Sequence, residues 1–253
     1  MGSLVFDAIL GKSEWADLKD FLTPTVFDVL PPRAAQRQVA ELLAGRLRPG
    51  DARSARETLA FPGVRATDGR VGPERIEARD EDARRRRGDA VLNLYFHQLL
   101  CRETTLLDLR ADRFRDADGE TTWRPGWLHV RWDPPFLTAL RQLYDGFYQD
   151  EPGQFDAAIA ALALQPARDV FLAHFGGGDQ TEVRFERATF VHTFHDAFLA
   201  CRDAGGPPLH RNFLALGLYL ATLYEHLERL GLAFDVRAAY LRARPQRSTP
   251  WQA

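Results

Sequence analysis

The residues best suited to chemistry lie in the segment VHTFHD, where two histidines precede an aspartate. His192 and His195 are three residues apart, so a helix would place both imidazoles within reach of one metal ion, with Asp196 adjacent. His226 is the main candidate for a further ligand, and other candidates are Glu225, His174 and Asp179. The same spacing also fits histidines that are hydrogen-bonded at a helix boundary without a metal.

A second group of candidates consists of aromatic side chains around the segment WLHVRW. Polar and apolar residues alternate here, which is typical of a short β-strand, and we expect it to belong to a hairpin. Trp127, His129 and Trp132 are the predicted ligand-binding residues, with Tyr95, Phe96 and Trp123 as possible neighbours. Aromatic residues at these spacings are more often part of a hydrophobic core.

Other motifs for covalent or phosphate chemistry are missing. The glycine loop GGGD at residues 176–179 matches neither a dinucleotide fingerprint nor a P-loop, so a turn between helices is the simpler interpretation. There is no GxSxG motif, and nothing in the sequence pairs Cys101 or Cys201 with a base. Two distant cysteines exclude a disulfide framework and favour a reducing cytoplasmic location.

The composition excludes several classes of partner. A formal net charge of −2 and an isoelectric point near 6.4 give no global attraction to nucleic acid or to an anionic membrane. We also expect no membrane span or secretion signal. Nearly all basic residues are arginines, with Lys12 and Lys19 the only lysines. This bias predicts anion recognition only where several arginines converge.

The element that must organise the chain is the segment from Leu209 to Leu230. Its apolar residues follow spacings of three and four, which predicts one continuous apolar stripe along a helix. No charged residue occurs from Phe213 to Tyr224, so we expect other elements to surround this part of the helix.

The remaining pattern is also mainly helical, and it predicts a mainly α fold, a multi-helix bundle with one short β-hairpin. We expect an N-terminal helical segment over 1–60, a linker or long loop over 61–79, a helical domain over 80–245 and a loose tail over 246–253. The hairpin is expected near 104–132, between a helix over 80–101 and a helical run from 136. The predicted N-terminal helices cover 13–22, 33–47 and 51–59.

The order of LLDLRADRF, DADGE, WLHVRW and the helices that follow resembles the C-terminal lobe of the AarF-type atypical kinases, which are linked to isoprenoid-quinone biosynthesis. In that family a helix leads into a loop of HADPHPGN type, then a hairpin whose second strand ends in DFG, then several helices. The resemblance covers about Leu92 to Leu241, and it closes with an apolar helix, a glycine-proline turn and Leu232-Ala233-Phe234-Asp235. It implies a kinase-like C-lobe, here without a recognisable N-lobe.

The catalytic motifs of that family are replaced. By position Asp108 is the possible remnant of the catalytic-loop aspartate, but Arg110 stands where a histidine is expected and Arg113 where the metal-binding asparagine belongs. WLHVRW leads to Asp133-Pro134-Pro135 instead of DFG, and matching Asp133 to that motif needs a shift of register. Phosphoryl transfer requires a bound metal and a lysine on the phosphates. The resemblance therefore implies a kinase remnant that does not catalyse in the family's way.

The sequence thus favours a non-catalytic, kinase-like protein that binds a protein partner or a small apolar ligand and needs no cofactor. Self-association into a homo-oligomer is also compatible with it. The alternative is a helical small-molecule enzyme with a metal or acid-base site centred on His192 and His195, which would require a divalent metal under the metal version. Neither the ligand nor the oligomeric state follows from the sequence.

Overall fold

The computed structural model of the protein describes residues 30–47, 49–57, 59, 61, 63–68, 76, 79–117, 120–174 and 182–245. The helix predicted over 13–22, the glycine loop at 176–179 and the tail over 246–253 lie outside these residues.

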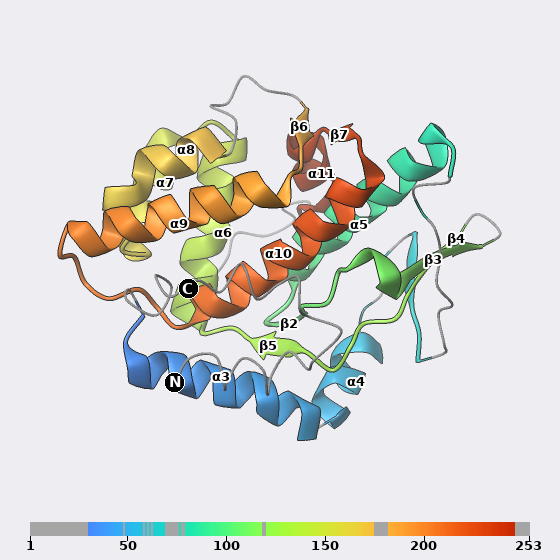
Figure 1. Ribbon diagram of the computed structural model, residues 1–253, viewed down its shortest axis with the longest axis horizontal. Helices are drawn as coiled ribbons and strands as arrows, with labels where there is room; N and C mark the ends of the chain where they lie inside the picture. The colour runs from blue at the N-terminus through green and yellow to red at the C-terminus, as the bar shows by residue number, and fades with distance from the viewer. Residues whose placement is uncertain are drawn as a thin grey trace.

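Helices make up most of the described chain, as predicted (Figure 1). The helices are α3 (Pro32–Leu47), α4 (Pro49–Glu57), α5 (Glu81–Cys101), α6 (Pro134–Tyr148), α7 (Pro152–Ala161), α8 (Arg168–His174), α9 (Arg187–Asp203), α10 (Asn212–Leu230) and α11 (Val236–Ala243). Short 3-10 turns occupy Ala111–Arg113 and Gln165–Ala167. Within the described residues, no helix combines the length and apolar character needed to cross a membrane.

The β-structure is more extensive than the single predicted hairpin. The strands are β1 (Val64–Ala66), β2 (Thr104–Leu106), β3 (Phe114–Ala117), β4 (Glu120–Trp123), β5 (His129–Arg131), β6 (Val183–Arg184) and β7 (Ala233–Phe234). The hairpin is β3–β4, and β1 adds to it in parallel along β4. WLHVRW contributes β5, which pairs antiparallel with β2, and β6 pairs with β7. These strands of two to four residues pair across long sequence separations, so local periodicity does not reveal them.

Side-chain caps explain where several helices begin. Asp80 accepts a hydrogen bond from the Ala83 backbone amide at 2.7 Å, and Glu81 follows in the first turn, where the helix dipole favours acids. Asp133 caps α6 in the same way, by accepting from the Phe136 amide, and prolines occupy the first helical positions. Asp133 is therefore a helix cap, which is the local role that its following prolines favour.

Helix α10 is the core helix that the apolar stripe predicted. It packs against α5, α9 and α3 and crosses the middle of the molecule in Figure 1. The residues of the stripe are buried except Leu220, which is half-buried. The helix ends at Gly231, whose φ of 67° lies in the left-handed region that glycine adopts without strain.

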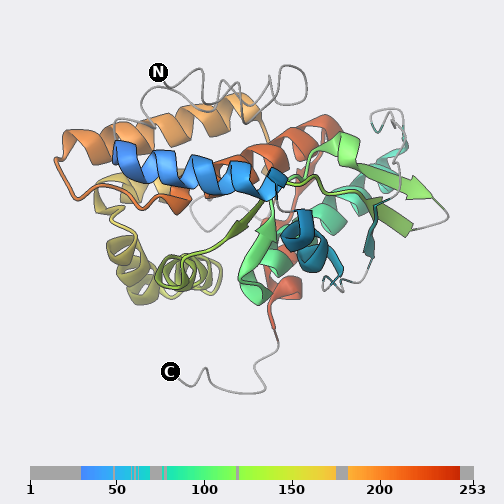
Figure 2. The ribbon, with the colours of Figure 1, turned by 90° about the horizontal axis from the view of Figure 1, so that it is seen from below.

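The N-terminal helices close the lower side of the molecule in Figure 1 and face the viewer in Figure 2. Helix α3 packs on α10 and β5, and α4 packs on β2. A buried hydrogen bond of 3.1 Å from Asn212 Nδ2 to Gln38 Oε1 joins α3 to the start of α10. Residues 64–66, which the sequence assigns to the linker, form β1. As a result, α4 and the segment after β1 both approach the loop that follows β2.

Candidate functional site: an arginine-lined hollow

The loop over residues 107–113 is held in place by side chains on one face of α10, which contact its backbone carbonyls. Thr222 Oγ1 donates to the Leu107 carbonyl at 2.7 Å, and His226 Nδ1 lies 2.8 Å from the Leu109 carbonyl. The two α10 side chains are four residues apart and therefore point the same way. Because a carbonyl only accepts, His226 Nδ1 must carry the proton. Helix α10 is thus the template on which this loop is shaped.

The α10 side chains that hold the loop are themselves removed from water. His226 is fully buried, and burial lowers its pKa to about 3, so the imidazole is neutral at ordinary pH. The neighbouring Glu225 accepts from the Ala111 amide at 2.9 Å, and burial raises the pKa of its carboxyl. His226 Nε2 has no hydrogen-bond partner among the described residues. The histidine therefore serves the loop as a neutral donor.

Asp108, the candidate catalytic remnant, is bound by two arginines. Its Oδ1 accepts from Arg110 Nε at 2.8 Å, while its Oδ2 accepts from Arg110 Nη2 at 2.8 Å and Arg113 Nε at 2.9 Å. Asp108 is only 1% exposed and Arg110 only 6%. Both carboxylate oxygens are thus engaged by cations. A general base needs a lone pair directed at its substrate, and this arrangement makes the carboxylate a counter-ion instead.

The segment that follows β4, Arg124-Pro125-Gly126, closes against Asp108. A Cβ atom placed on Gly126 would lie 3.1 Å from Asp108 Oδ2, so the absence of a side chain permits this close approach. Trp123, the last residue of β4, donates from Nε1 to the Asp108 carbonyl at 2.9 Å. Both sides of the aspartate are therefore tied to the end of the β3–β4 hairpin.

A hollow of about 280 Å³ opens beside Asp108, and we call it the arginine hollow. Four arginines from three separate parts of the chain line it: two from α4, one from the loop and one after β4. Its lining residues are Ala52, Arg53, Arg56, Asp68, Asp108, Arg113, Arg124, Pro125, Gly126, Trp127 and Leu128. This is the convergence of arginines that would distinguish anion recognition from a compositional bias.

The four arginines differ in how they are paired. Arg113 is bound to Asp108, and Arg56 lies 2.5 Å from Asp68. Arg53 and Arg124 are exposed and have neither a hydrogen-bond nor an ion-pair partner for their side chains in the part of the chain that the structure describes. The guanidiniums of the lining outnumber its carboxylates by two, and Arg110, which shares Asp108, is offset by Asp112, whose Oδ1 lies 3.8 Å from Arg113 Nε. The arginine hollow is therefore electrostatically suited to an anion.

The three predicted ligand-binding residues do not share one pocket. Trp127 lines the arginine hollow, whereas His129 lines a second pocket, which is formed by residues of α3, α4 and β5. Trp132 is buried in the core, where its Nε1 donates to Thr105 Oγ1 at 2.7 Å and its ring stacks on Phe136. Only His129 lies within β5, whereas Trp127 precedes the strand and Trp132 follows it, so the three side chains have different neighbours.

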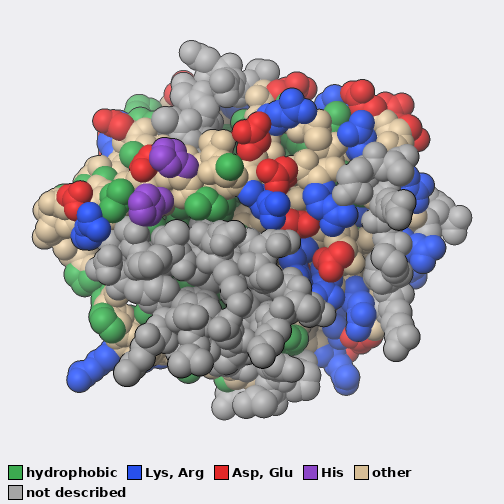
Figure 3. All heavy atoms as spheres, viewed as in Figure 1, with side chains coloured by type: hydrophobic (Ala, Val, Ile, Leu, Met, Phe, Trp, Pro, Cys, Tyr) green, Lys and Arg blue, Asp and Glu red, His purple; other side chains and the backbone are tan. Residues whose placement is uncertain are grey.

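The predicted metal ligands lie in different surroundings. His192 is exposed on α9, and its Nε2 lies 3.4 Å from Asp196 Oδ2 one turn further on. His195 is half-buried on the same helix, while His226 is buried on α10. Among the described residues, no group of three or more His, Cys, Asp or Glu side chains is placed to hold a metal. Histidine side chains stand at the surface in Figure 3, where acidic and basic groups are interspersed.

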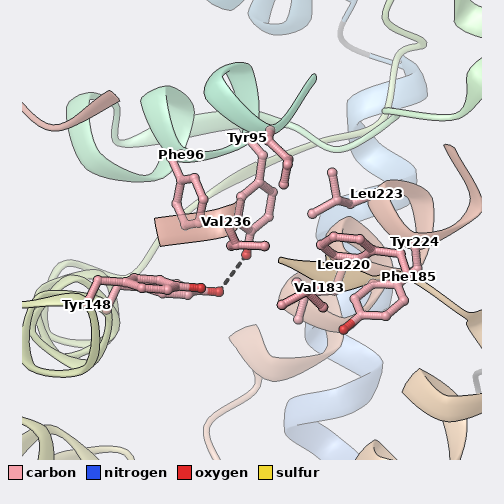
Figure 4. Close-up of a pocket in the computed structure, with 11 residues that line it drawn as sticks. Tyr95, Phe96, Tyr148, Val183, Phe185, Leu220, Leu223, Tyr224 and Val236 are labelled. Carbon is pink, nitrogen blue, oxygen red and sulfur yellow. Dashed lines mark hydrogen bonds between the residues drawn. The ribbon is translucent and has the colours of Figure 1, made fainter. Parts of the chain in front are cut away.

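A second cavity, which we call the tyrosine pocket, lies between α5, α6 and α10 (Figure 4). Tyr95 and Tyr144 meet there with their hydroxyl oxygens 2.6 Å apart, and burial raises the pKa of Tyr144 to about 12. The cavity measures about 40 Å³, which is room for no more than a few water molecules. It is lined by Leu92, Tyr95, Phe96, Tyr144, Tyr148, Val183, Phe185, Leu220, Leu223, Tyr224 and Val236.

The sequence did not single out Arg53, Arg56 or Arg124. The available signal was weak: two arginines three residues apart on a short helix, and one arginine in front of a proline-glycine pair. No family model matches the chain, and no curated protein matches it significantly.

Proposed function

We propose that this chain is a non-catalytic binding domain with the organisation of a kinase C-lobe. The observation that carries the proposal is the Asp108 carboxylate, which is neutralised by Arg110 and Arg113 at distances of 2.8 to 2.9 Å. An aspartate in this state neither accepts a proton from a substrate hydroxyl nor carries free negative charge for a metal ion.

The order of elements supports the kinase-like part of the proposal. Helix α5 leads through β2 into the loop that holds Asp108, the β3–β4 hairpin follows, and the chain then becomes helical from α6. The sequence resemblance places DFG after WLHVRW, but the second strand of the observed hairpin is β4, which is followed by Arg124-Pro125-Gly126, and our proposal takes this as the corresponding position. Asp133, which the family resemblance would match to the DFG aspartate after a shift of register, caps α6 instead.

The substitutions at the two expected metal-ligand positions support the absence of catalysis. Arg113 stands in place of the loop asparagine, and Arg124 follows the second strand of the observed hairpin, where our proposal places the family's aspartate. Both positions contribute to the arginine hollow. A guanidinium repels Mg²⁺ and offers donors only, so neither position can coordinate the ion.

The ligand of this domain is best sought at the arginine hollow. The tyrosine pocket is too small for a small apolar ligand, while the hollow is larger and carries unpaired arginines at its edge. A protein partner that presents an acidic group would fit the same surface. The enzyme centred on His192 and His195 is not proposed, because no described observation favours it.

Calorimetric titration with ATP, with and without Mg²⁺, tests this proposal. We expect that Mg²⁺ does not strengthen nucleotide binding and that no phosphoryl transfer occurs. Asp108→Asn serves as the matched variant, because it removes the charge and keeps the side-chain shape. Mg²⁺-dependent micromolar binding that is abolished in Asp108→Asn would contradict a non-catalytic role.

A further inference from the structure

We propose that the arginine hollow binds a dianionic phosphoryl group, as inorganic phosphate or as a phosphomonoester. This inference rests on the proposed function, since it assigns a ligand class to the loop that has lost its catalytic role. It is carried by the geometry of four arginines that come from three separate segments and meet around one cavity.

The first argument is electrostatic. Guanidinium groups repel one another, and the arginine hollow contains two more guanidiniums than carboxylates. Arg53 and Arg124 face it without a partner within the described residues, although exposed carboxylates are available elsewhere on the surface. A bound dianion would balance the two excess charges. A phosphomonoester carries about −1.5 to −2 at neutral pH, which matches this excess.

The second argument is preorganisation. Arg113 is held by Asp108, which is itself buried, and Arg56 is held by Asp68. Only 13% of the Arg56 side chain and 17% of the Arg113 side chain are exposed. The Arg113 guanidinium is thus oriented before any ligand arrives, which lowers the entropy lost on binding. Arg56 is mostly buried, but the side chain of its partner Asp68 is 70% exposed, so this pair orients Arg56 less firmly. The planar fork of a guanidinium matches two phosphate oxygens at once, as a lysine ammonium does not.

The third argument concerns the size of the group that the arginine hollow can hold together with a phosphoryl group. At about 280 Å³ it holds more than a bare ion, and Trp127 adds an aromatic surface next to the charged one. A phosphoryl group with a short attached chain, such as a phosphorylated serine side chain or a small phosphate ester, fits this lining. A bound Mg²⁺ is not expected here, because the lining carries an excess of positive charge that would repel it.

The experiment is calorimetric titration of the full chain at constant ionic strength with inorganic phosphate, O-phosphoserine and acetate as separate probes. We expect both phosphoryl probes to bind at least tenfold more tightly than acetate, and the tighter of the two identifies free phosphate or an ester as the better ligand. Arg53→Gln and Arg124→Gln should each weaken binding about tenfold, which is about 1.4 kcal/mol, and the double variant about a hundredfold.

Arg37→Gln on α3 is the matched control, because it removes an exposed arginine away from the hollow and should leave the affinity unchanged. Trp127 supplies an independent readout: phosphate should change the tryptophan emission, and Trp127→Phe should remove most of that change. The inference is overturned if neither inorganic phosphate nor O-phosphoserine binds, if acetate binds as tightly as they do, or if Arg53→Gln/Arg124→Gln binds them like the unmodified chain. It is also overturned if the emission change persists in Trp127→Phe.

The two proposals fail separately. Mg²⁺-dependent nucleotide binding through Asp108 would remove the non-catalytic role and leave the phosphate titration unaffected. Absence of binding by both phosphoryl probes would remove the ligand assignment and leave unchanged the contacts of Asp108 with Arg110 and Arg113, on which the proposed non-catalytic role rests.

Discussion

The arginine hollow and the tyrosine pocket are two cavities of opposite character within one small domain. The hollow forms where a short helix, a loop and a strand end meet, and such irregular elements bring charged side chains together. The tyrosine pocket forms where helices turn apolar faces toward one another, so it is nearly filled. The difference shows that the loop side of the domain, and not its helical interior, has room for a ligand.

The two cavities also differ in how their polar groups are satisfied. In the tyrosine pocket, Tyr95 and Tyr144 pair with each other, and the hydroxyl groups need no outside partner. In the arginine hollow, Arg53 and Arg124 have no partner among the described residues. A set of polar groups that is complete within the fold contributes to stability, whereas an incomplete set at a surface is suited to binding.

The largest effect on the free energy of unfolding is expected from a substitution of Asp108 in the lining of the arginine hollow. Asp108→Ala leaves Arg110 and Arg113 without their counter-ion in a mostly buried place, which should lower the free energy of unfolding by about 3–5 kcal/mol. Urea unfolding measures this loss. Arg124→Gln, at the exposed edge of the same hollow, should stay within about 0.5 kcal/mol. Similar losses for the two variants would mean that the ion pairs of Asp108 with Arg110 and Arg113 do not stabilise the fold.

A slightly smaller loss of unfolding free energy is expected when a side chain that lines the tyrosine pocket is shortened. Leu223→Ala removes a side chain that is 2% exposed, which should lower the free energy of unfolding by about 2–4 kcal/mol and enlarge the cavity. The enlarged pocket should then bind benzene, detected as a rise in melting temperature that the unmodified chain does not show. Leu241→Ala, at a leucine that is 48% exposed, is the control. Benzene binding by the unmodified chain would contradict the small pocket.

The smallest of the three effects is the pH dependence of the free energy of unfolding that His226 causes. The pKa of His226 is about 3 in the folded chain and about 6.5 when unfolded, so the unfolded state binds the proton more readily. Its contribution to stability is present above pH 6.5 and is lost progressively as the pH falls toward 3. Between pH 7 and pH 5 the loss should be about 2 kcal/mol.

His226→Gln isolates this contribution. The variant keeps a donor for the Leu109 carbonyl but does not titrate, so its stability should fall about 2 kcal/mol less than that of the unmodified chain between the two pH values. Urea unfolding at both pH values gives the comparison. His97 and His210, whose pKa values are also lowered by burial, are unchanged in both chains. An equal pH dependence in the two chains would show that His226 is not buried in its neutral form.

Much of the helical structure was predictable because its signals are local. The acids after Asp80, the prolines after Asp133 and the glycine-proline turn before Leu209 mark helix boundaries within a few residues of the observed ones. The strands were less predictable, since β1 and β5 gain their partners from sequence positions about 57 and 25 residues away. A three-residue strand has too little pattern of its own to reveal such a partner.

The candidate site was predictable only in part. Asp108, Arg113 and Trp127 were identified from the sequence, but Arg53, Arg56 and Arg124 were not, and the predicted metal ligands proved to lie in different surroundings. Trp132 was expected to face a ligand and instead fills the core. An aromatic residue next to a strand fits either role, because the face that it occupies depends on what packs there.

The sequence by itself determined the mainly helical fold and the central position of Leu209–Leu230, because helical periodicity and capping depend on residues within a few positions of one another. Only the tertiary structure decided that Asp108 is a counter-ion and that Arg53, Arg56, Arg113 and Arg124 share one cavity. The physical reason is distance. Electrostatic interactions act over a few ångströms in space, and these side chains come within that range only after segments far apart in the sequence have packed together.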